Sequence, residues 1–119
     1  MNGLSTRDVA RWSGATYRQL DHWDREDVLT PSVRRTIGSG LPRVYDPVDA
    51  ALAAVCADLS TLHASLDVMR AVVDRLRMLD VWPDTITVGV DGRIGDLPGW
   101  TVPAAARLAA TATLYAVAC

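Results

Sequence analysis

The apolar and polar positions at the start of the chain predict a short helix that begins after Ser5. Serine is a good helix N-cap, and Asp8 in the first turn favours the positive end of a helix. Gly14 ends the helix, because glycine adopts a left-handed C-cap at little cost. The apolar side of this helix consists of Val9, Ala10 and Trp12.

A second short helix is predicted over residues 17–26, with Thr16 as its N-cap. Leu20 and Trp23 have the i, i+3 spacing of a buried pair, and Pro31 prevents the helix from continuing. Two short helices joined by a turn that contains glycine are typical of a helix-turn-helix. The same pattern also fits a helical hairpin with a polar outer face.

The next segment predicts a β-hairpin. Its arms, residues 32–35 and 43–45, are rich in β-forming side chains and enclose a glycine-rich tip at residues 37–42. Both arms carry arginine, which binds phosphate groups well. The hairpin therefore predicts a wing that binds the DNA backbone. Solubility is the alternative role for its basic residues, which are Arg34, Arg35 and Arg43.

Two longer helices are predicted after this N-terminal head, which we define as residues 4–45. The first covers residues 46–59, and its apolar stripe is Val48, Leu52, Val55 and Leu59. The second is capped by Ser65 and runs to about residue 79. Its roughly fourteen residues span about 21 Å at 1.5 Å per residue. That length is enough to pack on the head but short for a long antiparallel dimer coil.

The periodicity changes again near the C-terminus and predicts a small appendage. Residues 85–90 alternate as a strand, Asp91-Gly92 is a strong hairpin turn, and residues 93–97 would return as the partner strand. An alanine-rich helix would follow over residues 103–110. Residues 113–118 fit either a third strand or a continuation of that helix.

The start of the second predicted helix holds the candidate base-reading residues. In a helix-turn-helix this helix enters the major groove, and its N-terminal side chains reach base edges. Arg18 matches guanine and Gln19 matches adenine in hydrogen-bonding geometry. The full candidate set is Thr16, Tyr17, Arg18 and Gln19.

Charge is distributed unevenly along the chain. The net charge is −2, but residues 1–45 hold seven arginines and five acids, while residues 46–119 hold five arginines and nine acids. The weakly positive half is thus the half with the predicted DNA-binding motif. All twelve basic residues are arginine, which suits phosphate and guanine contacts, although GC-rich coding bias explains the absence of lysine more simply.

The chemistry-bearing residues give no sign of a catalytic, metal or cofactor site, and an enzyme is the least expected class. Cys56 lies on an apolar helical stripe and is expected to be a buried hydrophobe, far in sequence from Cys119. His22 and His63 lack the neighbouring ligands that a metal site needs. The sequence has no secretory signal and no apolar run of membrane-spanning length. A cytoplasmic protein with reduced thiols is therefore expected.

The order of these motifs resembles the MerR-type winged-helix regulators over roughly residues 4–60. The resemblance implies homodimeric DNA binding, with base-facing roles for Tyr17 and Arg18 and backbone roles for Arg43 and Tyr45. It rests on Val9-Ala10, Gly14, Leu20, His22-Trp23-Asp24, Leu29-Thr30-Pro31, Arg43-Val44-Tyr45 and Asp49. An actinobacterial and actinophage branch is similar in residues 17–23, Thr30-Pro31-Ser32-Val33-Arg34 and Gly38-Ser39-Gly40.

Two residues depart from the family pattern. Asp21 stands where most of the family has arginine, directly after Leu20. This substitution removes a phosphate ligand, so weaker affinity and a different docking angle are expected. Asp27 stands where glycine is usual, and aspartate can still adopt the left-handed conformation.

Together these features predict an α+β fold with a winged helix-turn-helix head, two connecting helices and a small ββαβ C-terminal appendage. The third strand is preferred to a continued helix because the related branch closes with one. We expect residues 1–59 to form the DNA-binding domain and residues 60–119 a connecting helix and a small α/β region for dimerisation or sensing. The apolar final strand would prefer a partner, and self-pairing is the first expectation.

The predicted function is sequence-specific transcriptional regulation by a homodimer on double-stranded DNA, without a cofactor. The recognition helix would enter the major groove and the wing would bind the phosphate backbone. One alternative is an excisionase-like architectural factor that bends DNA. Another is a protein-binding adaptor that has lost strong DNA affinity. RNA polymerase is the expected partner of a regulator, and a recombinase is the expected partner of the architectural factor.

Overall fold

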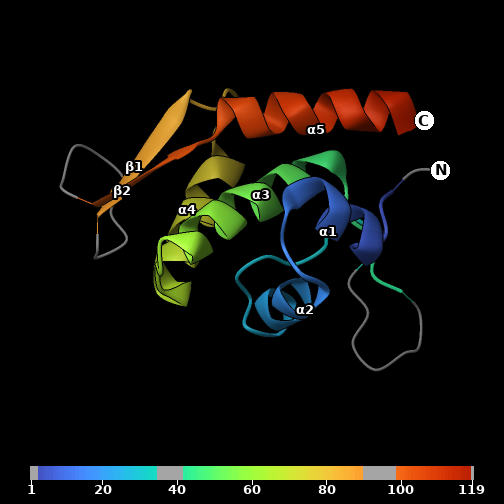
Figure 1. Ribbon diagram of the computed structural model, residues 1–119, viewed down its shortest axis with the longest axis horizontal. Coiled ribbons are helices and arrows are strands. Elements are labelled where there is room, and N and C mark those ends of the chain that lie inside the picture. Colours follow the sequence, from blue (N-terminus) through green and yellow to red (C-terminus); the bar gives the residue numbers. More distant parts are fainter. Residues whose placement is uncertain (1–2, 35–41, 90–98, 119) are drawn as a thin grey trace.

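Helix α3 (Pro47–Thr61) is the central element of the computed structural model, which describes residues 3–34, 42–89 and 99–118. Figure 1 shows α5 lying across one side of α3, while α1 packs on another side. The described elements follow the order α1 (Thr6–Ser13), α2 (Tyr17–Arg25), α3, α4 (Leu66–Met78), β1 (Thr85–Gly89), β2 (Gly99–Pro103) and α5 (Ala105–Ala118).

Local caps fix both ends of α1 and the start of α2, as the sequence predicts. The Ser5 hydroxyl accepts the Asp8 N–H at 3.1 Å, and the Asp8 carboxylate accepts the Ser5 N–H at 3.4 Å. Gly14 ends α1 in the left-handed conformation, with φ +82°. A second reciprocal cap, formed by Thr16 and Gln19, starts α2. These capping boxes satisfy backbone N–H groups that a helix start otherwise leaves without partners.

The two arms of the predicted hairpin lie side by side, but its tip is outside the described residues. Arg34 and Val44 form an antiparallel bridge, with N···O distances of 3.0 and 2.9 Å. Tyr45 in turn bridges Leu4, at 2.7 and 2.8 Å. The second arm therefore runs between the first arm and the N-terminal segment. The prediction for Arg35 and for residues 37–41 falls on the part of the chain that is not described.

Helix α3 is buried on all its sides rather than along one stripe. Every residue from 50 to 56 is buried, whereas Val48, which we predicted to belong to the apolar stripe, is 39% exposed. Four of these seven residues are alanine, whose small side chain lets neighbouring elements approach closely from several directions. A helix that is apolar all round is expected in a core rather than at a surface. One hydrophobic cluster accordingly extends from Leu4 to Ala104.

The C-terminal region forms a two-stranded sheet and a helix, so the predicted third strand at residues 113–118 is wrong. β1 pairs antiparallel with β2, and Thr85 lies opposite Pro103. The partner strand was predicted at residues 93–97, which lie outside the described residues, and it is observed at 99–103. Helix α5 begins at Ala105 and continues to Ala118. Once nucleated, an alanine-rich helix gains one backbone hydrogen bond per added residue. This gain outweighs the β propensity of the last residues.

Among the described residues, none of the helices combines the length and apolar character that a membrane-spanning segment requires.

Cys56 is completely buried in α3, as predicted, and burial raises the pKa of its thiol to about 12. Only the thiolate reacts rapidly with alkylating reagents. In a Cys119→Ser variant at pH 8, we therefore expect a maleimide to label Cys56 no faster than the chain unfolds. Mass spectrometry of the labelled protein over time gives the rate.

The same variant in denaturant is the control, and there Cys56 should react within the mixing time. Equally rapid labelling under native conditions would show that the centre of α3 is open to solvent.

Candidate nucleic-acid interface

The N-terminal end of α2 presents a tyrosine and an arginine to solvent. Tyr17 is 60% exposed, and Arg18 is also exposed. Both follow directly after the cap residue Thr16, whose hydroxyl oxygen accepts the Gln19 N–H at 3.0 Å. Leu20 and Trp23 anchor the other side of α2 in the core. The cap and the buried pair therefore fix which side of α2 faces outward, and Tyr17 and Arg18 are on the accessible side.

Gln19 differs from these two residues, because both ends of its amide are occupied within the protein. Its Oε1 atom accepts the Thr16 N–H at 3.0 Å, and its Nε2 atom donates to the Ser60 hydroxyl at 3.2 Å. Ser60 lies in the last turn of α3. Gln19 thus caps α2 and joins it to α3. Reading adenine, the role predicted from the sequence, would require these contacts to break.

Arg43, predicted to bind the DNA backbone, is held by two carboxylates of α2. Its Nε atom donates to Asp24 at 2.7 Å and its Nη2 atom donates to Asp21 at 2.6 Å. Burial alone would lower the pKa of Arg43, but the hydrogen bonds to Asp24 and Asp21 raise it instead. The Arg43 side chain is 16% exposed and that of Asp24 is 1% exposed. The second arm of the hairpin is therefore fastened to α2 by a largely buried ion pair.

Asp21 has a structural role that the sequence analysis missed. We predicted that this departure from the family pattern removes a phosphate ligand; in the structure its carboxylate binds Arg43 and, at 3.0 Å, Arg25. The hydrogen bond from Arg43 is the main reason that the pKa of Asp21 is lowered. The signal for this role was the spacing of Asp21 and Asp24, because residues three apart share one face of a helix.

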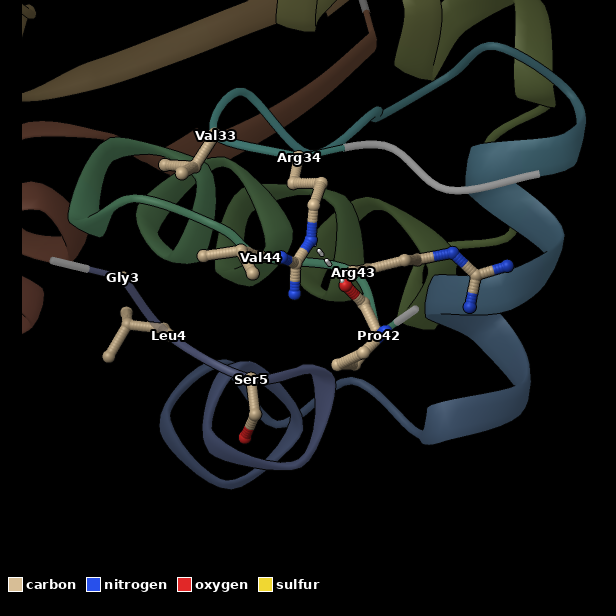
Figure 2. Close-up of a pocket in the computed structure, with 8 residues that line it drawn as sticks. All are labelled: Gly3, Leu4, Ser5, Val33, Arg34, Pro42, Arg43 and Val44. Atoms are coloured by element: carbon tan, nitrogen blue, oxygen red, sulfur yellow. Dashed lines mark hydrogen bonds between the residues drawn. The ribbon is translucent and has the colours of Figure 1, made fainter. Parts of the chain in front are cut away.

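The other predicted backbone ligands have different positions. Arg34 is exposed, and its Nε atom donates to the Pro42 carbonyl at 3.0 Å. The Arg34 side chain lies beside an open hollow of about 470 Å³ between the hairpin arms and the N-terminal segment. Figure 2 shows the residues that line it. Tyr45 is fully buried, and burial raises the pKa of its hydroxyl to about 12. The Tyr45 side chain therefore belongs to the core, and its burial counts against direct contact with DNA.

Helix α1 adds two exposed basic residues that the sequence analysis did not select. Arg7 and Arg11 are both exposed, and Arg11 lies 4.0 Å from Asp8. Their spacing of four residues places them on one face of α1. In a helix-turn-helix the first helix crosses the phosphate backbone. The spacing of Arg7 and Arg11 in the sequence was therefore a signal that both could be phosphate ligands.

No set of three or more histidine, cysteine, aspartate or glutamate side chains in the described part of the chain is arranged to hold a metal ion.

The Asp21–Arg43 pair should make stability depend on acidic pH. Folding lowers the pKa of Asp21 below its ordinary value of 3.8. The contribution of this carboxylate to stability is therefore complete above pH 3.8 and is lost as the pH falls through the lowered, folded-state pKa. For a partly exposed pair we expect Asp21→Asn to reduce the free energy of unfolding by about 1 kcal/mol at pH 7. Urea unfolding at several pH values measures the difference.

That difference should shrink below about pH 4 and disappear in stronger acid. The control is Asp80→Asn, which changes an exposed carboxylate in the loop after α4. A constant difference between wild type and Asp21→Asn at all pH values would mean that the charge of Asp21 has no part in the effect.

Comparison with known proteins gives three similar sequences, and no family model matches the chain. They are uncharacterized helix-turn-helix-type transcriptional regulators of Mycobacterium bovis and of two Mycobacterium tuberculosis strains. Each is 39% identical over 69 residues, which cover 58% of this chain and 31% of the relative. The chain thus matches about a third of the length of these relatives. The similarity supports a helix-turn-helix regulator, without specifying the MerR type.

Proposed function

We propose that this protein is a DNA-binding transcriptional regulator with a MerR-type winged helix-turn-helix. The observation that carries the proposal is the exposed pair Tyr17 and Arg18 at the capped N-terminal end of α2. A helix-turn-helix protein uses these positions to reach base edges in the major groove. The similarity to helix-turn-helix-type regulators supports the same function.

In this proposal four exposed arginines contact DNA. Arg18 reads guanine through two hydrogen bonds in the major groove, and Tyr17 packs against neighbouring base edges. Phosphate groups are bound on one side by Arg34 with the wing and on the other by α1, through Arg7 and Arg11. Arg43 acts inside the protein, where it holds the hairpin against α2.

Sequence-specific recognition would come from a homodimer. Two heads would read two half-sites separated by about 34 Å, or by a multiple of that helical repeat. Occupation or distortion of such a site would then alter the access of RNA polymerase, so no chemistry by the protein itself is needed.

Selection from random duplex DNA tests this function. The purified protein is incubated with a random library at two salt concentrations, and the bound DNA is sequenced. We expect an inverted repeat to be enriched, and affinity to fall steeply as salt rises because phosphate contacts release counterions. Absence of enrichment at both salt concentrations would contradict the proposal.

Arg18→Ala should weaken binding to the enriched duplex by roughly 10- to 100-fold and relax the preference at one base pair in each half-site. Fluorescence anisotropy with the enriched duplex and its single-base variants measures both effects. Arg75→Ala is the matched control, since Arg75 is an exposed arginine on α4. If the two variants bind equally well, Arg18 does not read bases.

A further inference from the structure

Arg70 of α4 contacts the C-terminal end of α2. Its Nε and Nη2 atoms both donate to the Glu26 carbonyl oxygen, at 3.0 and 2.8 Å. Its Nη1 atom donates to the Asp67 carboxylate at 2.6 Å, one turn earlier on α4. Asp67 thus orients the guanidinium group, and two parallel donors fix the position of one backbone oxygen of the head.

The Glu26 carbonyl belongs to the C-cap residue of α2, where the helix ends and the following segment begins. Asp27 adopts the left-handed conformation, with φ 56°. The turn then satisfies earlier carbonyls: the Asp27 N–H donates to Asp24 and the Val28 N–H donates to Trp23, at 3.2 and 2.8 Å. Arg70 completes this arrangement from a different helix. Its positive charge also suits the negative end of the α2 dipole.

Arg77 of α4 holds the other end of the same segment. Its Nη2 atom donates to the Thr30 carbonyl at 3.3 Å and to the buried Asp49 carboxylate at 3.0 Å. Its Nη1 atom donates to the Ser32 hydroxyl at 3.2 Å. Thr30 lies just before the first arm of the hairpin, and Ser32 is the first residue of that arm. Arg77 therefore fixes the point at which the chain enters the hairpin.

The two attachment points are held from one side of α4. Seven residues make two helical turns, so Arg70 and Arg77 lie on one face of α4, about 10 Å apart along its axis. In the sequence, residues 28 and 29 lie between the two attachment points of the segment, and both are buried in the core. Arg75 lies on the opposite side of α4 at 3.6 residues per turn and is exposed.

We propose that Arg70 and Arg77 are positioning residues for DNA recognition, which set the distance and angle between α2 and the hairpin. This inference rests on the proposed DNA-binding function. It adds that α4 determines how well both elements fit one duplex while Arg70 and Arg77 themselves stay off the DNA. Segment 26–32 is the link between the two elements, and both its ends are fastened to a single helix.

The experiment compares the full chain with Arg70→Ala, Arg70→Lys, Arg77→Lys and the control Arg75→Ala. Anisotropy measures binding to the enriched duplex and to a scrambled duplex over a series of salt concentrations. Amide hydrogen exchange of the free proteins, read by mass spectrometry, compares peptides that cover residues 26–34 with peptides from α3. The exchange measurement needs no DNA, so it examines the two attachments even if the proposed function fails.

We expect Arg70→Ala to weaken binding to the enriched duplex about tenfold relative to Arg75→Ala, with little change on the scrambled duplex. The slope of log affinity against log salt should match that of the wild type, because no phosphate contact is lost. Exchange should accelerate in residues 26–34 and stay slow in α3. Arg70→Lys should recover part of the affinity, since lysine keeps the charge and one donor, and Arg77→Lys should resemble Arg70→Ala.

Three outcomes would overturn the inference. Equal affinities of Arg70→Ala and Arg75→Ala would show that the contact with Glu26 does not affect recognition. A salt slope reduced by about one in Arg70→Ala would make Arg70 a direct phosphate ligand. Faster exchange throughout α3 in both Arg70→Ala and Arg70→Lys would indicate a general structural role. If the wild type prefers neither duplex, the proposed function fails instead, and unchanged exchange in residues 26–34 would then also reject the two attachments.

Discussion

The carboxylate of Asp49 is the group on which the arrangement of the head depends most. Its side chain is completely buried, and a buried charge is tolerated only when it is paired and hydrogen-bonded. Four donors meet this requirement: the N–H groups of Ser32 and Asp46, at 2.8 and 3.0 Å, the Ser32 hydroxyl at 2.6 Å and Arg77 at 3.0 Å. One residue in the first turn of α3 therefore connects the hairpin entry, its own helix cap and α4.

Asp49 also adds a directional contact to the apolar packing between the head and α3. From residue 50 to residue 56, α3 offers only buried side chains to its neighbours, and apolar packing is not directional. Hydrogen bonds at both ends of α3 add directional contacts between this helix and the head: Asp49 binds Ser32 near its start, and Ser60 binds Gln19 near its end. On the other side of α3, Arg107 of α5 binds Asp58 with two hydrogen bonds, at 2.7 and 3.0 Å.

The sequence predicts the features that local chemistry decides. Ser5, Gly14 and Thr16 act through neighbours within three or four residues, and the structure confirms their capping roles. Asp27 likewise adopts the left-handed conformation expected of it. The strand at residues 85–89 was predictable for the same reason, because alternation is a property of the segment itself.

The features that the sequence did not predict depend on partners far along the chain. Gln19 meets Ser60 across 41 positions, Arg43 meets Asp24 across 19 and Arg70 meets Glu26 across 44. The sequence around Gln19 and around Arg43 predicts DNA contacts, because it does not show which distant residue lies beside each side chain in the fold. Residues 113–118 form a helix instead of the predicted strand for a related reason. Their β propensity is a local preference, and the helix that begins at Ala105 overrides it.

The internal ion pairs also change the expected balance between charge and shape in DNA recognition. Seven arginines in residues 1–45 suggest a basic surface, yet Asp21 and Asp24 together bind Arg43, and Asp21 also binds Arg25. Non-specific attraction to DNA grows with the number of phosphates neutralised, and arginines held in internal ion pairs add less to it than freely exposed ones. Placing α2 and the hairpin correctly at the same time would then matter more for recognition. The hydrogen bonds of Arg43, Arg70 and Arg77 then have the same effect, because each fixes α2 or the hairpin relative to the rest of the fold.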